Sequence, residues 1–410
     1  MHFPKVAQFL VNNKKLLAFG FFLALVSSFG QSFFIGIIGP EIRAEFSLTQ
    51  SSWSLIYMLG TIASALVLPF SGQLIDKISL KYYTTLVILL LATSSAFIAI
   101  LPSVTFLLLA IFLLRQSGQG LMSHTSFVSM ARYFPDNRGK AAAIASLGLS
   151  VGQATLPFLM ILSVSLIGWR FSYGLISIAI VLVALPISLL LLSGDQFGQK
   201  NHISQSSMHG LEVGEVKSWS RKQVLRDVRF YILIPGVTAP SLVITALFFH
   251  NLTVAELKNW DSTWVVANYW VYSLGSLLAA LSSGPLIDHL SAKRVLPLFL
   301  IPLICSLLIV WGVNNMWWSI FYLFLLGLTA GVTYTGLTAL WAELYGVDHL
   351  GAIKSLYSSI GIFASALGPV VMGVMLDLDF SIELISLALA GYCIISTVIL
   401  FQGIFLYKNK

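Results

Sequence analysis

Charged side chains are scarce in this sequence. Asp, Glu, Lys and Arg together make up 10% of the 410 residues, whereas 57% of the residues are hydrophobic. A water-soluble domain usually carries about 25% charged residues, because its surface must stay hydrated. The mean hydropathy of +0.89 is correspondingly high. A chain this apolar needs lipid to cover it, so the composition excludes an ordinary soluble protein.

Cysteine and the common catalytic motifs are scarce as well. Cys305 and Cys393 are the only two cysteines and both lie in apolar stretches, so we predict no disulfide framework. The sequence also lacks a phosphate-binding P-loop, a Cys/His cluster with metal-ligand spacing and paired catalytic carboxylates. We therefore predict no cofactor, no metal site, no enzymatic activity and no ATP-driven transport by this chain on its own.

What the sequence does contain is a series of long apolar segments. Twelve of them reach the length of roughly 20 residues that a helix needs to cross a hydrocarbon core of ~30 Å. The first is longer than the core of a secretory signal and has no small-residue cleavage site, so we expect it to remain as a span. We predict an all-α membrane protein with twelve transmembrane helices near residues 17–39, 52–74, 81–101, 104–131, 140–166, 169–193, 229–252, 262–288, 294–313, 316–342, 350–375 and 381–406.

Basic residues are distributed unevenly among the loops. If the N-terminus lies in the cytoplasm, 19 of the 23 Lys and Arg residues fall on the cytoplasmic side. This bias follows the positive-inside rule, which sets orientation. We therefore predict cytoplasmic termini, the inner membrane of a bacterium as the location, and contact between the basic loops and anionic lipid. Because these residues are dispersed over short loops, nucleic acid is not an expected partner.

The chain consists of two halves that resemble each other. Six of ten residues are identical between 72–81 and 284–293, an offset of 212 residues, and the same offset also pairs Ser64 with Ser276, Tyr133 with Tyr345, Asp136 with Asp348, Gly139 with Gly351, and Pro157 with Pro369. Repeated halves around a central cavity are a transporter architecture. We predict two pseudo-symmetric six-helix bundles over 1–193 and 229–410, joined over 194–228 by a cytoplasmic linker with one amphipathic surface helix.

The repeated loop is the most specific motif. Its glycine permits a tight turn at the end of a helix, and its charged residues then lie at the cytoplasmic edge of the membrane. There they can pair with each other or with helix termini of the opposite half, and such contacts would hold one conformation and break in the other. For either copy alone, an ordinary polar loop is the alternative. The predicted gating residues are Gly72, Asp76, Lys77 and Lys81 in the first copy and Gly284, Asp288 and Lys293 in the second.

These motifs resemble those of the major facilitator superfamily. Gly72-x-Leu-x-Asp76-Lys77-x-x-x-Lys81 is similar to the loop between helices two and three of that superfamily. Its helix-four motif resembles Arg115-Gln-Ser-Gly118-Gln119-Gly120, and Gly168-Trp169-Arg170 recurs at the start of its helix six. The resemblance covers the whole chain. It implies a monomeric transporter whose helices one, four, seven and ten line the cavity.

One branch of that superfamily carries a further resemblance. Arg132-Tyr133-Phe134, followed by Arg138, Gly148, Gly152 and Pro157, looks like the helix-five signature of the monocarboxylate and oxalate/formate transporters. Two features of the monocarboxylate transporters are missing here. Helix one offers Gln31 and no lysine, and helix eight offers Asn268 and Tyr269 in place of an Asp–Arg pair. Lactate-type chemistry is therefore not carried over to this chain.

Polar residues at membrane depth are the candidates for substrate binding, because they are costly in lipid and usually face a cavity. Arg115 is foremost, since a cation in low dielectric can bind a carboxylate or phosphate through two parallel hydrogen bonds, and Gln119 lies one turn below it. An arginine that binds helix termini or backbone carbonyls is an equally weighted alternative. Interhelical hydrogen bonding, an interfacial position or plain packing are the alternatives for the further candidates Gln31, His250, Asn251, Asn268 and Tyr334.

Acidic residues are missing from the middle of every predicted span. A carrier of cations commonly needs a buried carboxylate, so their absence disfavours cationic substrates. The sequence favours secondary transport of a small organic anion, such as a carboxylate, with protons carried by His250, His124 or the substrate itself. The alternatives are efflux of an amphipathic neutral compound, which an aromatic content of 13% permits, and a non-transporting receptor or scaffold on a transporter fold.

Overall fold

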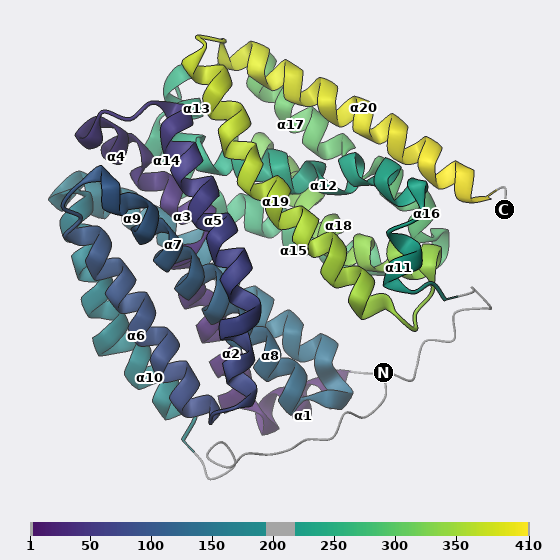
Figure 1. Ribbon diagram of the computed structural model, residues 1–410, viewed down its shortest axis with the longest axis horizontal. Helices are drawn as coiled ribbons and strands as arrows, with labels where there is room; N and C mark the ends of the chain where they lie inside the picture. Colours follow the sequence, from purple (N-terminus) through teal and green to yellow (C-terminus); the bar gives the residue numbers. More distant parts are fainter. Residues whose placement is uncertain (1–2, 194–217, 409–410) are drawn as a thin grey trace. The chain divides into compact units, whose positions relative to one another are not determined.

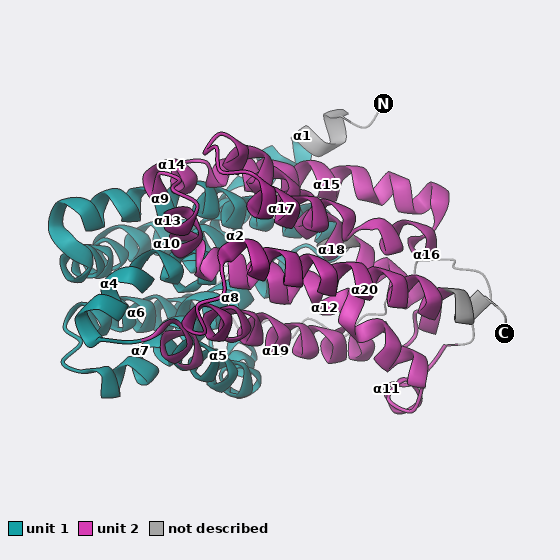
Figure 2. Ribbon diagram, turned by 90° about the horizontal axis from the view of Figure 1, so that it is seen from above, with its two compact units in different colours: residues 1–48, 56–205 teal, residues 49–55, 206–410 magenta. Residues whose placement is uncertain are grey.

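The computed structural model describes residues 3–193 and 218–408 of the chain. Helices joined by short turns make up this described part, which contains no strand (Figure 1). The chain divides into two compact units (Figure 2). Unit 1 comprises residues 1–48 and 56–205, and unit 2 comprises residues 49–55 and 206–410.

Unit 1 holds a short leading helix and the first six spans. Two of its helices continue through π-helical segments, Arg115–Met122 and Ile180–Ala184. Its α-helices are α1 (Phe3–Asn12), α2 (Lys14–Val26), α3 (Ser32–Ile35), α4 (Gly39–Phe46), most of α5 (Gln50–Gly72), α6 (Leu80–Ala99), α7 (Leu107–Leu114), α8 (Ser123–Tyr133), α9 (Arg138–Ala179) and α10 (Leu185–Leu191).

Unit 2 holds the other six spans. The part of the predicted linker that covers 194–217 lies outside the described residues, and the rest contains α11, whose first turn is capped reciprocally by Ser220 and Gln223. The helices of unit 2 are α11 (Arg221–Val224), α12 (Val228–Phe249), α13 (Asn251–Leu257), α14 (Ser262–Ala267), α15 (Tyr269–Leu290), α16 (Ala292–Val295), α17 (Ile301–Gly312), α18 (Trp318–Tyr345), α19 (Leu350–Asp377) and α20 (Ile382–Lys408).

The number of spans agrees with the sequence once one sharp turn is taken into account. Ten stretches of the described residues are long and apolar enough to cross a membrane, and a bent pair, Lys14–Gly30 with Ser32–Phe46, adds an eleventh. The longest stretch, Arg138–Leu191, is interrupted at Gly168, where φ is 76° and ψ is 162°. This φ is readily adopted only by glycine, and it separates the predicted spans five and six. The predicted all-α, twelve-helix membrane fold is thereby confirmed.

The two units share one close helix crossing. In each unit the first and fifth spans cross closely, as α2 with α9 and as α12 with α19. A Cβ atom on Gly148 of α9 would lie 1.9 Å from the carbonyl oxygen of Phe21, and one on Gly368 of α19 would lie 2.0 Å from that of Leu242. Such close backbone contact is typical of membrane helices, which associate through small residues. Both units therefore share this close crossing, although Gly148 and Gly368 do not lie at equivalent positions of the sequence repeat.

The first turn of α5 groups with unit 2. Both carboxylate oxygens of Asp377, at the end of α19, accept hydrogen bonds from the backbone amides of Gln50 (2.9 Å) and Ser51 (2.8 Å). These amides have no partner within the helix, so a carboxylate caps them favourably. Trp53 also stacks on Phe249, with ring centroids 5.4 Å apart. Residues 49–55 therefore belong to unit 2, and the rest of α5 belongs to unit 1.

Candidate functional site

The first span of unit 1 is discontinuous. After α2, residues Ser27–Gly30 form a 3-10 turn, Gln31 is extended (φ −86°, ψ 155°), and α3 begins at Ser32. Backbone groups at such a break leave the regular helical hydrogen-bond pattern. At membrane depth, interrupted helices are tolerated where protein or a cavity surrounds them, and in transporters they typically form the substrate site.

The fourth span changes its winding opposite this break. Arg115–Met122 is π-helical and therefore carries extra residues per turn, a feature that is frequent at functional sites. Gly30 of the first span meets Gly118 of the fourth so closely that a Cβ on Gly30 would lie 2.7 Å from the Gly118 Cα and 2.5 Å from the Leu114 carbonyl oxygen. Any larger residue at position 30 would push the two backbones apart, so both irregular segments depend on glycine here.

Arg115 lies at this crossing as a buried cation. Its side chain is 2% exposed, its Nη1 donates to the Gly30 carbonyl oxygen (3.0 Å), and its guanidinium carbon lies 5.1 Å from the centroid of the Tyr57 ring. Within the described part of the chain, Arg115 forms no ion pair, and its Nε has no hydrogen-bond partner. One carbonyl and one aromatic face compensate only part of the cost of burying a full positive charge. The guanidinium therefore favours an anion that can complete its contacts.

Three of the residues predicted for the site meet at this crossing. Gln31 follows Gly30 directly, and the backbone nitrogen of Gln119 would lie 2.8 Å from a Cβ on Gly30. Both glutamine side chains are half-buried. Sequence reasoning missed Gln116, whose Oε1 accepts from Ser64 (2.9 Å) and whose Nε2 donates to Ser71 (2.8 Å). These bonds fix the π-helical segment against α5 and thereby hold the neighbouring Arg115 in place.

The other predicted site residues belong to unit 2, where the described ones have structural contacts. His250 Nε2 lies 3.1 Å from the Ser54 hydroxyl and 2.9 Å from the Pro369 carbonyl oxygen. Asn251 donates to the Tyr269 hydroxyl (2.9 Å), and Asn268 donates to the Trp264 carbonyl oxygen (2.8 Å) of its own turn. The Tyr334 side chain lies outside the described residues. A role for these four residues in substrate binding stays a prediction.

The first copy of the repeated loop is attached to the fourth span. Asp76 forms an ion pair with Arg132 of α8, and Arg132 also donates to the Ile75 carbonyl oxygen (3.3 Å). Lys77 and Lys81 are exposed and form no ion pair with any described residue. Sequence reasoning had not considered Arg132 as a partner, because it lies 56 residues further along the chain.

The second copy is attached to the equivalent helix by a different contact. Glu343 of α18 accepts hydrogen bonds from the backbone amides of Ala292 (2.6 Å) and Lys293 (3.2 Å), at the start of α16. Asp288 is exposed and forms no ion pair with a described residue. In the first copy the loop supplies the carboxylate, whereas in the second the helix supplies it. The two matching sequences therefore make different contacts.

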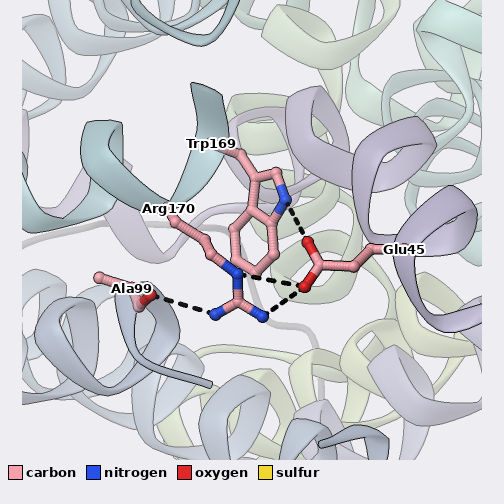
Figure 3. Close-up of polar contacts among 4 residues, drawn as sticks. All are labelled: Glu45, Ala99, Trp169 and Arg170. Atoms are coloured by element: carbon pink, nitrogen blue, oxygen red, sulfur yellow. Dashed lines mark hydrogen bonds and ion pairs between the residues drawn. The ribbon is translucent and has the colours of Figure 1, made fainter. Parts of the chain in front are cut away.

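A third polar cluster lies at the turn within α9 (Figure 3). Glu45 accepts hydrogen bonds from Trp169 Nε1 (3.0 Å) and from Arg170 Nε (3.1 Å) and Nη2 (2.5 Å), and Arg170 Nη1 donates to the Ala99 carbonyl oxygen (3.1 Å). The guanidinium also lies over the Trp169 ring, 4.4 Å from its centroid. This cluster explains the Gly168-Trp169-Arg170 motif. The turn at Gly168 presents both side chains to Glu45 and so joins the ends of α4 and α6 to the turn within α9.

Replacing Glu45 with glutamine should destabilise unit 1 modestly. The pair is about one-third exposed, so water screens it, and the loss should be about 1 kcal/mol. Thermal unfolding of the purified protein measures this change. Glu41→Gln on the same helix is the control, because Glu41 is exposed and forms no ion pair with a described residue. An equal loss of stability in Glu45→Gln and Glu41→Gln would show that the cluster does not stabilise these helix ends.

Comparison with known proteins agrees with this architecture. A sequence model of one protein family, described as the Major Facilitator Superfamily, matches residues 20–272 and 263–408. No curated protein matches the chain in sequence. The solved structure of a bacterial homologue of the human lysosomal transporter Spinster, inward-facing and unoccupied, has a TM-score of 0.73 with 14% identity, over 97% of this chain and 98% of that chain. The nucleoside transporter NupG has a TM-score of 0.74 with 13% identity, over 95% and 99%. Identities this low establish a shared fold and leave the substrate open.

Proposed function

This chain belongs to the major facilitator superfamily, and we propose that it carries a small organic anion across the membrane by alternating access. Family and fold make it a multi-pass membrane transporter rather than an enzyme. The positive-inside bias supports an orientation with both termini in the cytoplasm, in the inner membrane of a bacterium.

The observation that carries this proposal is the incomplete environment of Arg115. A guanidinium has five N–H donors, and the described structure gives it one carbonyl acceptor, at Gly30. Removing a cation from water costs several kcal/mol unless a partner of opposite charge accompanies it. A bound anion would supply that partner. Arg115 lies between a broken first span and a π-helical segment of the fourth span, and irregular helices of this kind often form substrate sites in transporters, which supports the proposal.

A carboxylate is the anion that fits this arginine most simply. Its two oxygens match two parallel donors of the planar guanidinium, which a lysine could not offer. The resemblance of Arg132-Tyr133-Phe134 and the residues after it to the monocarboxylate and oxalate/formate branch supports the same class. Proton coupling belongs to this proposal as well. No acidic residue lies in the middle of a predicted span, so the transferred proton would be carried by the acid itself, by His250 or by His124.

Uptake into proteoliposomes tests the proposal. Labelled mono- and dicarboxylates, nucleosides and neutral amphipathic compounds are offered with and without an inward proton gradient. We expect one class of acid to accumulate, the gradient to increase its uptake, and excess unlabelled acid to abolish it. Uptake of nucleosides or neutral compounds in preference to every acid would refute the anion assignment. If an acid accumulates to the same extent with and without the proton gradient, proton coupling would be refuted and the anion assignment would stand.

A further inference from the structure

A basic and apolar surface lies at the leading end of unit 1, outside the candidate site. It is formed by α1, by the start of α2 and by the junction between α8 and α9 (Figure 1). Phe9 of α1 packs edge-on against Phe134, with ring centroids 5.4 Å apart, and the Lys140 Nζ lies 5.9 Å from the Phe9 ring centroid. These two contacts fix α1 against unit 1 through one side chain.

The rest of the described part of α1 leaves apolar side chains uncovered. Leu10 is 41% exposed and Val11 is 67% exposed. Only Asn13 separates α1 from α2, which is the start of the first membrane span, and Asn13 caps α1 through two bonds to the Phe9 carbonyl oxygen (3.2 and 2.9 Å). Because one residue joins α1 to the span, the C-terminal end of α1 must lie near the edge of the bilayer. Its exposed leucine and valine are therefore placed to contact lipid rather than water.

Most of the charges around this helix are basic. Lys14 and Lys15, at the start of α2, are exposed, as are Arg138 and Lys140 at the start of α9, and none of them forms an ion pair with a described residue. Within the two sequence ranges 1–15 and 133–140, the only acidic residue is Asp136, whose side chain lies outside the described residues. Basic side chains beside an interfacial apolar face are the usual features that retain anionic lipid headgroups.

We propose that this surface, made by Leu10, Val11, Lys14, Lys15 and Lys140, binds the headgroup of an anionic phospholipid. The apolar pair enters the boundary between headgroups and acyl chains, and the three ammonium groups contact the phosphate and keep α1 on the membrane. This inference is independent of the transported substrate. The positive-inside bias predicts contact with anionic lipid for the basic loops in general. The proposal assigns the recognition of one lipid headgroup to α1 and its neighbours.

Native mass spectrometry of the full-length protein tests this surface. The protein is titrated with phosphatidylglycerol and, separately, with phosphatidylcholine of the same chains. We expect the wild type to retain phosphatidylglycerol in preference, and Lys14→Gln/Lys15→Gln/Lys140→Gln to lose this preference. Each lysine near an anionic surface contributes a factor of about five, so the triple change should weaken retention roughly a hundredfold.

Two further variants keep the outcome unambiguous. Arg221→Gln/Lys222→Gln/Lys354→Gln removes three exposed basic residues of unit 2, and it should keep the preference. Lys14→Arg/Lys15→Arg/Lys140→Arg keeps the charge and should retain the lipid, which separates loss of charge from misfolding. Equal retention of both lipids by the wild type, or equal loss in both neutralised variants, would overturn the proposal. An acidic peptide that displaces the lipid completely would assign the surface to a protein partner and overturn it as well.

Discussion

Replacing Arg115 with lysine should lower the affinity for a transported carboxylate by roughly thirtyfold. The ammonium keeps the charge but loses the planar pair of donors, and one lost charge-assisted hydrogen bond is worth about 2 kcal/mol. Arg115→Ala should lose more, because the Gly30 carbonyl oxygen then also loses its donor. The KM for uptake into proteoliposomes measures the change, and the variants should still be inserted into the membrane.

A ligand-dependent measurement separates substrate binding from a structural role. A substrate at saturating concentration raises the free energy of unfolding by mass action, so the wild type should show a thermal shift with the acid and Arg115→Lys little or none. Arg138→Lys is the matched control, because Arg138 is exposed at the start of α9. If Arg115→Lys lowers stability without ligand and leaves the shift intact, the arginine only anchors the Gly30 carbonyl. The equally weighted alternative from the sequence would then be right.

Much of the fold could be predicted from the sequence, because span length and apolar content are properties of composition. The division between spans five and six was predicted between 166 and 169, and the structure turns at Gly168. Gly148, which the sequence singled out within the helix-five signature, lies against the backbone of Phe21. In both cases the relevant constraint is local, since glycine alone fits the turn and the close approach.

The irregular backbone of the candidate site could not be predicted in the same way. Hydropathy gave the first span as one helix over 17–39, whereas the structure breaks it at Gln31 and also winds Arg115–Met122 as a π-helix. Neither change alters the apolar content of its segment, so hydropathy cannot detect it. Both irregular segments lie where Gly30 contacts Gly118, and these two residues are far apart in the sequence. The polar partners Arg132, Glu343 and Glu45 were missed for the same reason. A systematic pairing of charged residues at the same predicted membrane edge would have suggested them.

Replacing Asp76 with asparagine should slow turnover about tenfold while leaving the substrate affinity unchanged. The Asp76 carboxylate is 62% exposed, so its ion pair with Arg132 contributes at most about 1 kcal/mol to stability. A larger effect on rate would show that the pair favours one conformation of the transport cycle. Single-turnover uptake reports the rate, and equilibrium binding of labelled substrate reports the affinity. Lost binding with unchanged turnover would contradict a gating role.

The same substitution in the second loop should have little effect, because the two copies are attached differently. Asp288→Asn removes a carboxylate that pairs with no described residue, whereas Glu343→Gln weakens the acceptor of the Ala292 and Lys293 amides and should slow turnover as Asp76→Asn does. An Asp76→Arg/Arg132→Asp exchange should restore part of the rate, since the pair is re-formed with reversed charges. Equal slowing by Asp76→Asn and Asp288→Asn would mean that the two loops act through the residues they share in sequence, and that the contacts which distinguish them have no part in gating.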